Sequence, residues 1–203
     1  MATTTERRQR FDGERSRQKI LRAAANLATI EGLEGISIGN LAAHIGMSKS
    51  GLYAHFGSKE QLQLATIDAA LDMFNSEVVE PAQSAAGPRE RLSKLYDRFL
   101  DHIERRVFPG GCFFASADSE FGMQEGPVKD RIAEIQQAWT ASVVQLVREA
   151  QAAGELQAGE DPAQIAFELD AYGMMGNIAF VLHDEPAYLD HARTAIRRRL
   201  AGN

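Results

Sequence analysis

A run of small, polar and basic side chains between residues 49 and 55 has the chemistry that reading a DNA groove requires. The run is KSGLYAH, and within two helical turns it offers an amine, a hydroxyl, a phenol and an imidazole. Exposed helices that read the major groove present hydrogen-bonding groups of this kind to the base edges. The run therefore indicates nucleic-acid recognition, provided that its neighbours form a helix and hold it at the surface.

The flanking residues predict two short helices joined by a tight turn. The first is Ile38–Ile45, with Ser37 as its N-cap and Gly46 as its stop. The second is Lys49–Phe56, which follows Ser48 as its cap and buries two apolar side chains four residues apart. Helix, Gly-containing turn, helix is the pattern of a helix-turn-helix. The alternative is a merely solvated helical hairpin, which the agreement of caps, stops and inward apolar positions disfavours.

The segment GMSKSGLYAHFGSKEQL resembles the recognition segment of the tetracycline-repressor-like (TetR) family of bacterial transcription regulators. The match spans about residues 15–67 and departs from the family pattern at two places. Gly39 stands where a polar or basic side chain is often found, and Ser50-Gly51 stands where many relatives carry Gly followed by Thr. The helix therefore presents unusually small side chains at the middle of its face.

The resemblance implies DNA-binding roles for eight residues. Lys49 and Ser50 are the candidates for base edges, and Gly51 allows the backbone to approach closely. The candidates for phosphate contacts are Ser37, Ser48, Tyr53, His55 and Lys59. For the tyrosine, an equally simple interpretation is that its ring covers the edge of the core.

Composition narrows the class of protein. The chain has 203 residues, 44% of them hydrophobic, which is enough for a sizeable core. It has no run of eighteen apolar residues, and its charged N-terminus lacks the apolar stretch of a signal peptide. Cys112 is the single cysteine, which excludes an internal disulfide and a Cys-based zinc finger. These features favour a cytoplasmic protein without a membrane span.

The net charge of −6 is unevenly distributed along the chain. Residues 1–60 contain nine Lys or Arg and six Asp or Glu, a net charge of +3, so that residues 61–203 carry −9. A basic end on an acidic body favours contact with phosphates through that end alone.

The pattern divides the chain into an arm and two helical domains. Residues 1–13 read as a flexible basic arm, or simply as a solubilising tail, with Arg7, Arg8 and Arg10 as candidates for DNA contact. Residues 14–60 form the predicted DNA-binding domain, which begins with a helix over about 14–31. A long helix over 59–79 is the predicted link to a second helical domain over 80–203. The predicted fold class is therefore all-α.

The segment Pro162–His183 is apolar on nearly every face, so we expect it to be buried nearly all round. It is either the centre of its domain or shared with a second subunit. Gly173 and Gly176 would allow neighbouring backbones to approach closely. The resemblance implies a homodimer through about residues 162–200.

The sequence offers little for catalysis. It lacks a nucleophile elbow, a phosphate-cradling loop and an HExxH motif, and its five histidines are scattered. His102, beside Asp101, and Cys112 come nearest to a metal or thiol site, but a half-exposed histidine and a buried cysteine are the commoner interpretation. We therefore predict no catalytic residue, no metal site and no cofactor.

Family members bind a small molecule in the second domain, and the resemblance implies such a site here. The candidate lining residues are aromatic, Met and His side chains: Tyr96, Phe99, His102, Phe113, Phe114, Trp139, Tyr172 and Met175. Such a set favours an apolar or aromatic ligand with few polar contacts. Each of these residues could equally be ordinary core.

The leading hypothesis is a dimeric repressor that a small apolar or aromatic ligand releases from a palindromic DNA operator. The alternative from another class is an all-helical small-molecule-binding protein or enzyme with a vestigial DNA-binding domain. A third possibility is a regulator controlled by a protein partner, which a filled core around Tyr96, Phe99 and Trp139 would favour. The intact polar face at residues 49–55 argues against a vestige.

Overall fold

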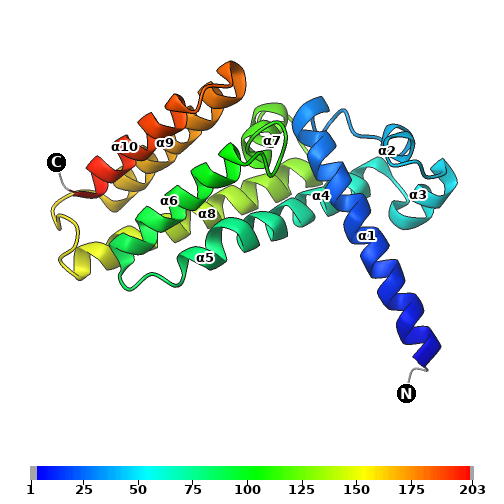
Figure 1. Cartoon of the computed structure of the whole chain (residues 1–203), viewed down its shortest axis with the longest axis horizontal. Coiled ribbons are helices and arrows are strands. Elements are labelled where there is room, and N and C mark those ends of the chain that lie inside the picture. The colour runs from blue at the N-terminus through cyan, green and yellow to red at the C-terminus, as the bar shows by residue number, and fades with distance from the viewer. Residues whose placement is uncertain (1–3, 202–203) are drawn as a thin grey trace.

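The computed structural model describes the backbone of residues 4–201 and the side chains of residues 13, 14 and 16–201, and this part of the chain contains helices and no strand. Helices α2 (Ile38–His44) and α3 (Lys49–Phe56) stand at one end of the molecule, and α9 (Pro162–His183) and α10 (Ala187–Ala201) lie along the flank at the other end (Figure 1). The predicted all-α class, with an N-terminal helix-turn-helix domain and a helical C-terminal domain, is confirmed.

The N-terminal domain packs α1 (Thr4–Glu31), α2 (Ile38–His44) and α3 (Lys49–Phe56) around one apolar core. Its most deeply buried side chains are Ala24, Ala25, Leu33, Ile36, Leu41 and Leu52. The bounds of α3 are those predicted, and α2 ends one residue earlier than expected. Leu52 and Phe56 point inward as predicted, so the other side of α3 faces solvent.

Helix α1 is longer than predicted, because it begins at Thr4 rather than near residue 14. Most of the segment that we assigned to a flexible arm is thus helical in the structure. Glu, Arg and Gln, which dominate this stretch, are good helix formers, and no proline interrupts it. The side chains proposed for DNA contact there, Arg7, Arg8 and Arg10, lie outside the described side chains.

The link between the domains is not one regular helix. Helix α4 runs over Lys59–Phe74, a π-helical turn follows over Asn75–Val79, and α5 covers Glu80–Ala82. The sequence predicted an uninterrupted helix over 59–79, and its apolar spacing carried no sign of the wider turn. π-helical turns inside α-helices occur frequently at functional sites.

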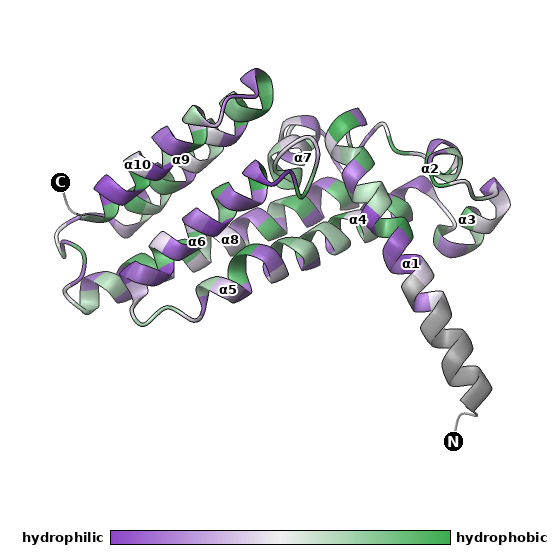
Figure 2. Ribbon diagram, viewed as in Figure 1, coloured by the Kyte–Doolittle hydropathy of each residue, from purple (hydrophilic) through white to green (hydrophobic). Residues whose placement is uncertain are grey.

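Five further helices form the C-terminal domain: α6 (Pro88–Glu104), α7 (Phe113–Phe121), α8 (Pro127–Ala152), α9 (Pro162–His183) and α10 (Ala187–Ala201). Hydrophilic and hydrophobic residues alternate in bands along α6 (Figure 2), as expected of a helix that packs one side onto the core. Helix α9 packs one side against α6, α8 and α10. Contrary to the prediction from the sequence, it is not buried nearly all round within one chain, because its other side lies at the flank of the domain (Figure 1).

Helix α9 approaches its neighbours closely at two glycines, as the sequence predicted. A Cβ atom on Gly176 would lie 2.8 Å from the Cβ of Ala192 in α10, and one on Gly173 would lie 3.0 Å from Cε1 of Phe99 in α6. The opposite side of α9 remains exposed within one chain, where Phe167 is 69% and Leu182 is 73% accessible. Helix α9 is long and apolar enough to cross a membrane, but the core helix of a soluble protein can have the same length and composition.

Candidate nucleic-acid interface and internal cavity

The polar face of α3 is exposed at the end of the molecule. Lys49, Ser50 and His55 are accessible, and Tyr53 is 57% exposed. No hydrogen bond or ion pair to the amine of Lys49 is found among the described side chains. The tyrosine ring is thus not a cover for the core, and the whole face is free to meet another molecule.

Two of the predicted phosphate-binding serines cap the helices of the helix-turn-helix. Ser37 Oγ accepts a hydrogen bond from the Asn40 backbone amide at 3.1 Å, and Asn40 Oδ1 accepts one from the Ser37 amide at 2.6 Å. Ser48 Oγ accepts from the Gly51 amide at 3.1 Å. A Cβ on Gly51 would lie 3.0 Å from that Oγ, so the glycine also leaves room for the cap. Both hydroxyls therefore position the helices, a role that the sequence indicated for Ser37 and Ser48.

Two basic residues flank α3. Lys59 Nζ pairs with Glu34 Oε1 at 2.7 Å on the surface, where the lysine side chain is 43% exposed. Arg17 Nη1 donates to the His55 carbonyl at 3.2 Å, and the Arg17 guanidinium lies 4.7 Å above the Phe56 ring. Arg17 thereby holds the end of α3 to α1, a structural role that sequence reasoning missed.

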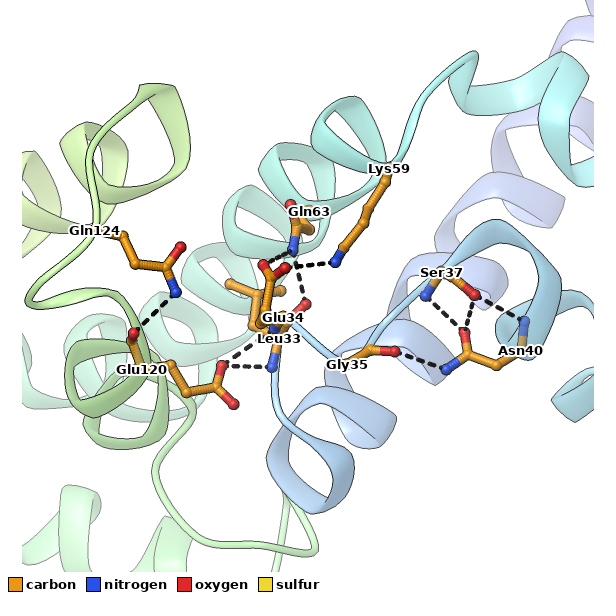
Figure 3. A network of polar contacts seen from close by, with 9 residues as sticks. All are labelled: Leu33, Glu34, Gly35, Ser37, Asn40, Lys59, Gln63, Glu120 and Gln124. Atoms are coloured by element: carbon orange, nitrogen blue, oxygen red, sulfur yellow. Dashed lines mark hydrogen bonds and ion pairs between the residues drawn. The ribbon is translucent and has the colours of Figure 1, made fainter.

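A network of polar contacts joins the C-terminal domain to the turn that precedes α2 (Figure 3). Glu120 Oε2, at the end of α7, accepts from the Leu33 amide at 2.7 Å and from the Glu34 amide at 3.2 Å. Gln63 of α4 donates to the Leu33 carbonyl at 2.9 Å and to Glu34 Oε2 at 3.2 Å. The turn is thus held from both α7 and α4.

A half-open cavity of about 740 Å³ lies between α4, its π-helical turn, α6, α7, α8 and α9. Its aromatic wall consists of Phe74, Tyr96, Phe99, Phe114, Phe121 and Trp139. Polar and charged groups interrupt the wall at Asn75, Asp118, Lys129, Arg131, Glu134, Gln136, Ser142 and Asp170. A space of this size and lining suits a small organic molecule.

The structure brings together about half of the predicted ligand-binding residues. Tyr96, Phe99, Phe114 and Trp139 line the cavity, whereas Phe113 is buried in the core beside it. Tyr172 is half-buried on α9 and lies outside the cavity wall.

Met175 was predicted to line the cavity, but its side chain is 59% exposed on the outer face of α9. Its neighbour Met174 lines the cavity instead. Successive residues of a helix point about 100° apart, and the close packing of Gly173 and Gly176 fixes which side of α9 faces inward.

His102 belongs to the core and does not reach the cavity. Its ring lies 5.9 Å from the Phe74 ring and 5.2 Å from the Phe108 ring, and neither ring nitrogen has a hydrogen-bond partner among the described residues. Burial lowers the pKa of His102 to about 4, so the imidazole is neutral at physiological pH. It offers no ligand-binding group in this state.

Three acidic residues on the cavity wall were missed: Asp118, Glu134 and Asp170. Asp170 accepts hydrogen bonds from Tyr96 Oη at 2.6 Å and from Trp139 Nε1 at 2.9 Å, while Asp118 accepts one from Gln136 Nε2. Desolvation raises the pKa of Asp170, and it raises the pKa of Asp118 to about 6. For Asp170, a carboxylate in the middle of the predominantly apolar segment 162–183 was the available sequence signal.

Cys112 also lines the cavity, and it is buried. Burial raises the pKa of its thiol to about 11, so the thiol is protonated at neutral pH. Within residues whose side chains the structure describes, no cluster of three His, Cys, Asp or Glu side chains could hold a metal ion.

Comparisons with known proteins bear on both domains. Residues 20–66 match the family described as bacterial regulatory proteins, tetR family, and residues 88–196 match the tetracyclin repressor-like C-terminal domain. The transcriptional regulator AcuR of Cereibacter sphaeroides is 27% identical over 158 residues, which are 76% of this chain and 71% of that protein.

Solved structures share the fold. A TetR transcriptional regulator from Chloroflexus aurantiacus superposes with a TM-score of 0.84 at 24% identity, covering 92% of this chain and 94% of that one. AibR in complex with isovaleryl coenzyme A and operator DNA superposes with a TM-score of 0.72 at 23% identity, covering 92% and 100%. Members of the matched family are regulators of transcription and, in general, soluble cytoplasmic proteins.

Proposed function

Since the chain belongs to the tetracycline-repressor-like family of bacterial transcription regulators, we propose that it represses transcription by binding a palindromic operator as a homodimer. The observation that carries this proposal is the exposed polar face of α3 at the end of the molecule. Its two inward side chains, Leu52 and Phe56, fix the helix to the core and leave the opposite face for DNA.

In this proposal Lys49 and Ser50 contact base edges, and Gly51 brings the backbone close to the DNA. Tyr53, His55 and the backbone amides at the N-termini of α2 and α3 contact phosphates, because helix N-termini favour anions. Ser37 and Ser48 act mainly by presenting those amides, and Lys59 reaches a phosphate by exchanging its surface pair with Glu34. These roles are assigned according to the exposure of each side chain.

The homodimer forms through α9 and α10, over about residues 162–200. Five large apolar side chains of α9 are exposed within one chain: Phe167, Met175, Ile178, Val181 and Leu182. Their spacing places them along one stripe of the helix, and a stripe of this size in water indicates a protein interface. A dimer also supplies two α3 helices, as a palindromic site requires.

We assign the cavity to a small-molecule effector that releases the DNA. Phe74, Asn75 and Val79, at the junction of α4 and the π-helical turn, line the cavity, and α4 begins at the DNA-binding domain. A ligand that binds better to a state with different α4 geometry would shift the spacing of the two α3 helices. The operator and acyl-coenzyme A complex of the structural neighbour AibR supports this class of control.

The functional units follow the predicted division: a DNA-binding domain over 14–60, α4 with its π-helical turn as the link, and an effector and dimerisation domain from residue 80. We place the protein in the cytoplasm and assign it no enzymatic activity, in line with its family. The alternative of a binding protein or enzyme with a vestigial DNA-binding domain is not favoured, because the face of α3 is intact. Control by a protein partner alone is disfavoured by the cavity.

The test is DNA binding by the full chain. Fluorescence anisotropy would compare a duplex from upstream of its own gene with a scrambled duplex at several salt concentrations. We expect tight binding to the former, a palindromic footprint and a steep salt dependence. Equal, weak binding to both duplexes at every salt concentration, with ligand-free protein, would refute the proposal.

A further inference from the structure

Two carboxylates on the cavity wall, those of Asp170 and Asp118, are incompletely paired within the described residues. Tyr96 Oη and Trp139 Nε1 both donate to the same oxygen of Asp170, Oδ1, at 2.6 and 2.9 Å. No donor to Oδ2 is found among the described side chains and backbone. The ring groups fix the orientation of this carboxylate and leave its second oxygen available to a ligand.

Asp118 repeats this arrangement on another wall. It lies on α7, where Gln136 of α8 donates to its Oδ2, and again no donor to the second oxygen is found in the described part of the chain. The two carboxylates reach the cavity from α7 and α9. An ionised carboxylate desolvated in this way needs hydrogen-bond donors and positive charge.

The basic residues of the cavity do not neutralise these carboxylates. Arg131 is engaged with Asp68 at 2.9 Å and with Glu134 at 2.6 Å. Lys129 is half-buried on α8, and no ion pair to its amine is found within the described residues. Lys129 is therefore the one lining group that would favour an anionic ligand, and the test below includes that outcome.

The remaining wall is aromatic around Asp170. The Trp139 ring lies 5.5 Å from Phe74 and 6.3 Å from Tyr96, both edge to face, and Phe74 lies 6.1 Å from Phe99. Aromatic rings beside a carboxylate accommodate an organic cation, because the apolar body packs on the rings and the charge meets the oxygen.

We propose that the effector is an organic cation, a protonated amine on an apolar or aromatic body, with its ammonium group bound by Asp170 beside the aromatic rings and with Asp118 adding negative charge to the same cavity. This inference rests on the proposed function, since it names the ligand class of the same cavity. It adds one charged contact to the expected apolar or aromatic ligand. The ammonium group would offset one of the two carboxylate charges.

Three probes with one apolar body and different charges test the proposal: naphthylethylammonium, naphthylethanol and naphthylpropanoate. Calorimetric titration of the full chain should show the ammonium compound binding about 10- to 100-fold tighter than the other two, as expected for hydrogen bonds to a charged group. Asp170→Asn keeps the acceptor for Tyr96 and Trp139 but removes the charge, and it should lower the affinity for the ammonium compound about tenfold or more.

Asp130→Asn is the matched control, because Asp130 is an exposed aspartate of α8 outside the cavity wall. It should leave the affinities for all three probes within about twofold. Equal affinities for the three probes, tighter binding of the propanoate, or no binding of the ammonium compound at millimolar concentration would overturn the proposal. Lys129→Ala would then show whether that lysine binds the propanoate.

Operator binding distinguishes a failure of this ligand proposal from a failure of the proposed function on which it rests. If the ligand-free chain binds its operator and the propanoate or the alcohol releases it, the regulator stands and the cationic ligand does not. If the ligand-free chain fails to bind the operator, the proposed function fails, whatever the cavity prefers.

Discussion

Glu120 accepts a hydrogen bond of 2.7 Å from the backbone amide of Leu33, and this bond joins the effector domain to the turn before the helix-turn-helix. Gly32 sits in the same turn at φ +84°, and a Cβ there would lie 1.8 Å from Glu120 Oε1. Two residues before Glu120 in α7, Asp118 lines the cavity. One short helix therefore touches both the cavity and the support of α2.

This relationship predicts that Glu120→Ala weakens the coupling between effector and DNA. Without the carboxylate, the Leu33 and Glu34 amides lose their shared acceptor, and movement of α7 no longer reaches the turn. Couplings in proteins commonly change affinity about 5- to 150-fold, and we expect the release of operator by naphthylethylammonium to shrink several-fold. Fluorescence anisotropy of labelled operator, with and without the compound, measures the change.

Glu125→Ala is the control for that experiment, because Glu125 is exposed beyond the end of α7 and has no hydrogen bond within the described part of the chain. A readout independent of the ligand is hydrogen exchange of the Leu33 amide, which should accelerate in the Glu120 variant alone. Unchanged release and unchanged exchange would show that α7 does not carry the coupling.

Asp118→Asn should stabilise the ligand-free protein at neutral pH. The pKa of Asp118 is raised from about 3.8 to about 6, so the folded state binds more protons than the unfolded state between these values. Ionised Asp118 therefore lowers the free energy of unfolding above pH 6, and wild-type stability recovers as the pH falls toward 4. Asparagine keeps an acceptor for Gln136 and avoids this cost.

After allowance for solvent screening, the gain at pH 7.5 is about 1–2 kcal/mol. Each kcal/mol of this gain should raise the thermal midpoint of unfolding by about 2–4 °C. The other charged residues of the cavity wall are the same in the wild-type protein and in the Asp118→Asn variant: Lys129, Arg131, Glu134 and Asp170. Thermal unfolding at pH 7.5 and pH 4.5 checks the sign, since the advantage should decrease at the lower pH. A stabilisation that is the same at both would contradict the assignment to Asp118.

The helices whose ends are marked by capping residues or a glycine could be predicted from the sequence. Helices α3 and α9 have the predicted bounds, because Ser48 and Asp161 cap their N-termini and Gly57, at φ +72°, ends α3. The early start of α1 and the π-helical turn at Asn75–Val79 could not be predicted, since neither changes the apolar spacing on which the prediction relied.

The site was predictable only in part, for a related reason. Aromatic residues are recognisable as candidates, and Tyr96, Phe99 and Trp139 do line the cavity. Which of two adjacent methionines faces inward depends on how α9 packs against α6 and α10, and Met175 was therefore misplaced. Asp118 and Asp170 were missed because their positions on the cavity wall depend on how α7 and α9 each pack against α8.

Lys49→Ala and Lys59→Ala should weaken DNA binding in different ways. Lys49 lies on the exposed face of α3 with no partner in the described structure, so its loss should reduce the preference for operator over scrambled DNA by about 1–3 kcal/mol. Lys59 is paired with Glu34 beside the start of α4, and its loss should weaken binding to both duplexes and reduce the salt slope by about one. Anisotropy titrations at several salt concentrations distinguish the two. Parallel losses of specific and non-specific affinity in both variants would refute this division.

Ile178→Glu should dissociate the proposed dimer. The Ile178 side chain is 51% exposed on the apolar face of α9, and a carboxylate buried there between two subunits would have no counter-charge. We expect the dimer dissociation constant to rise about 100-fold or more, measured by analytical ultracentrifugation, and the affinity for a palindromic operator to fall with it.

Met123→Glu places the same charge at an apolar residue that is 99% exposed outside α9, and should leave the dimer intact. Because both variants exchange a large apolar side chain for glutamate, a monomer formed only by the first identifies α9 as the interface. A dimer of unchanged stability in both variants would show that the dimer interface lies on a surface other than α9.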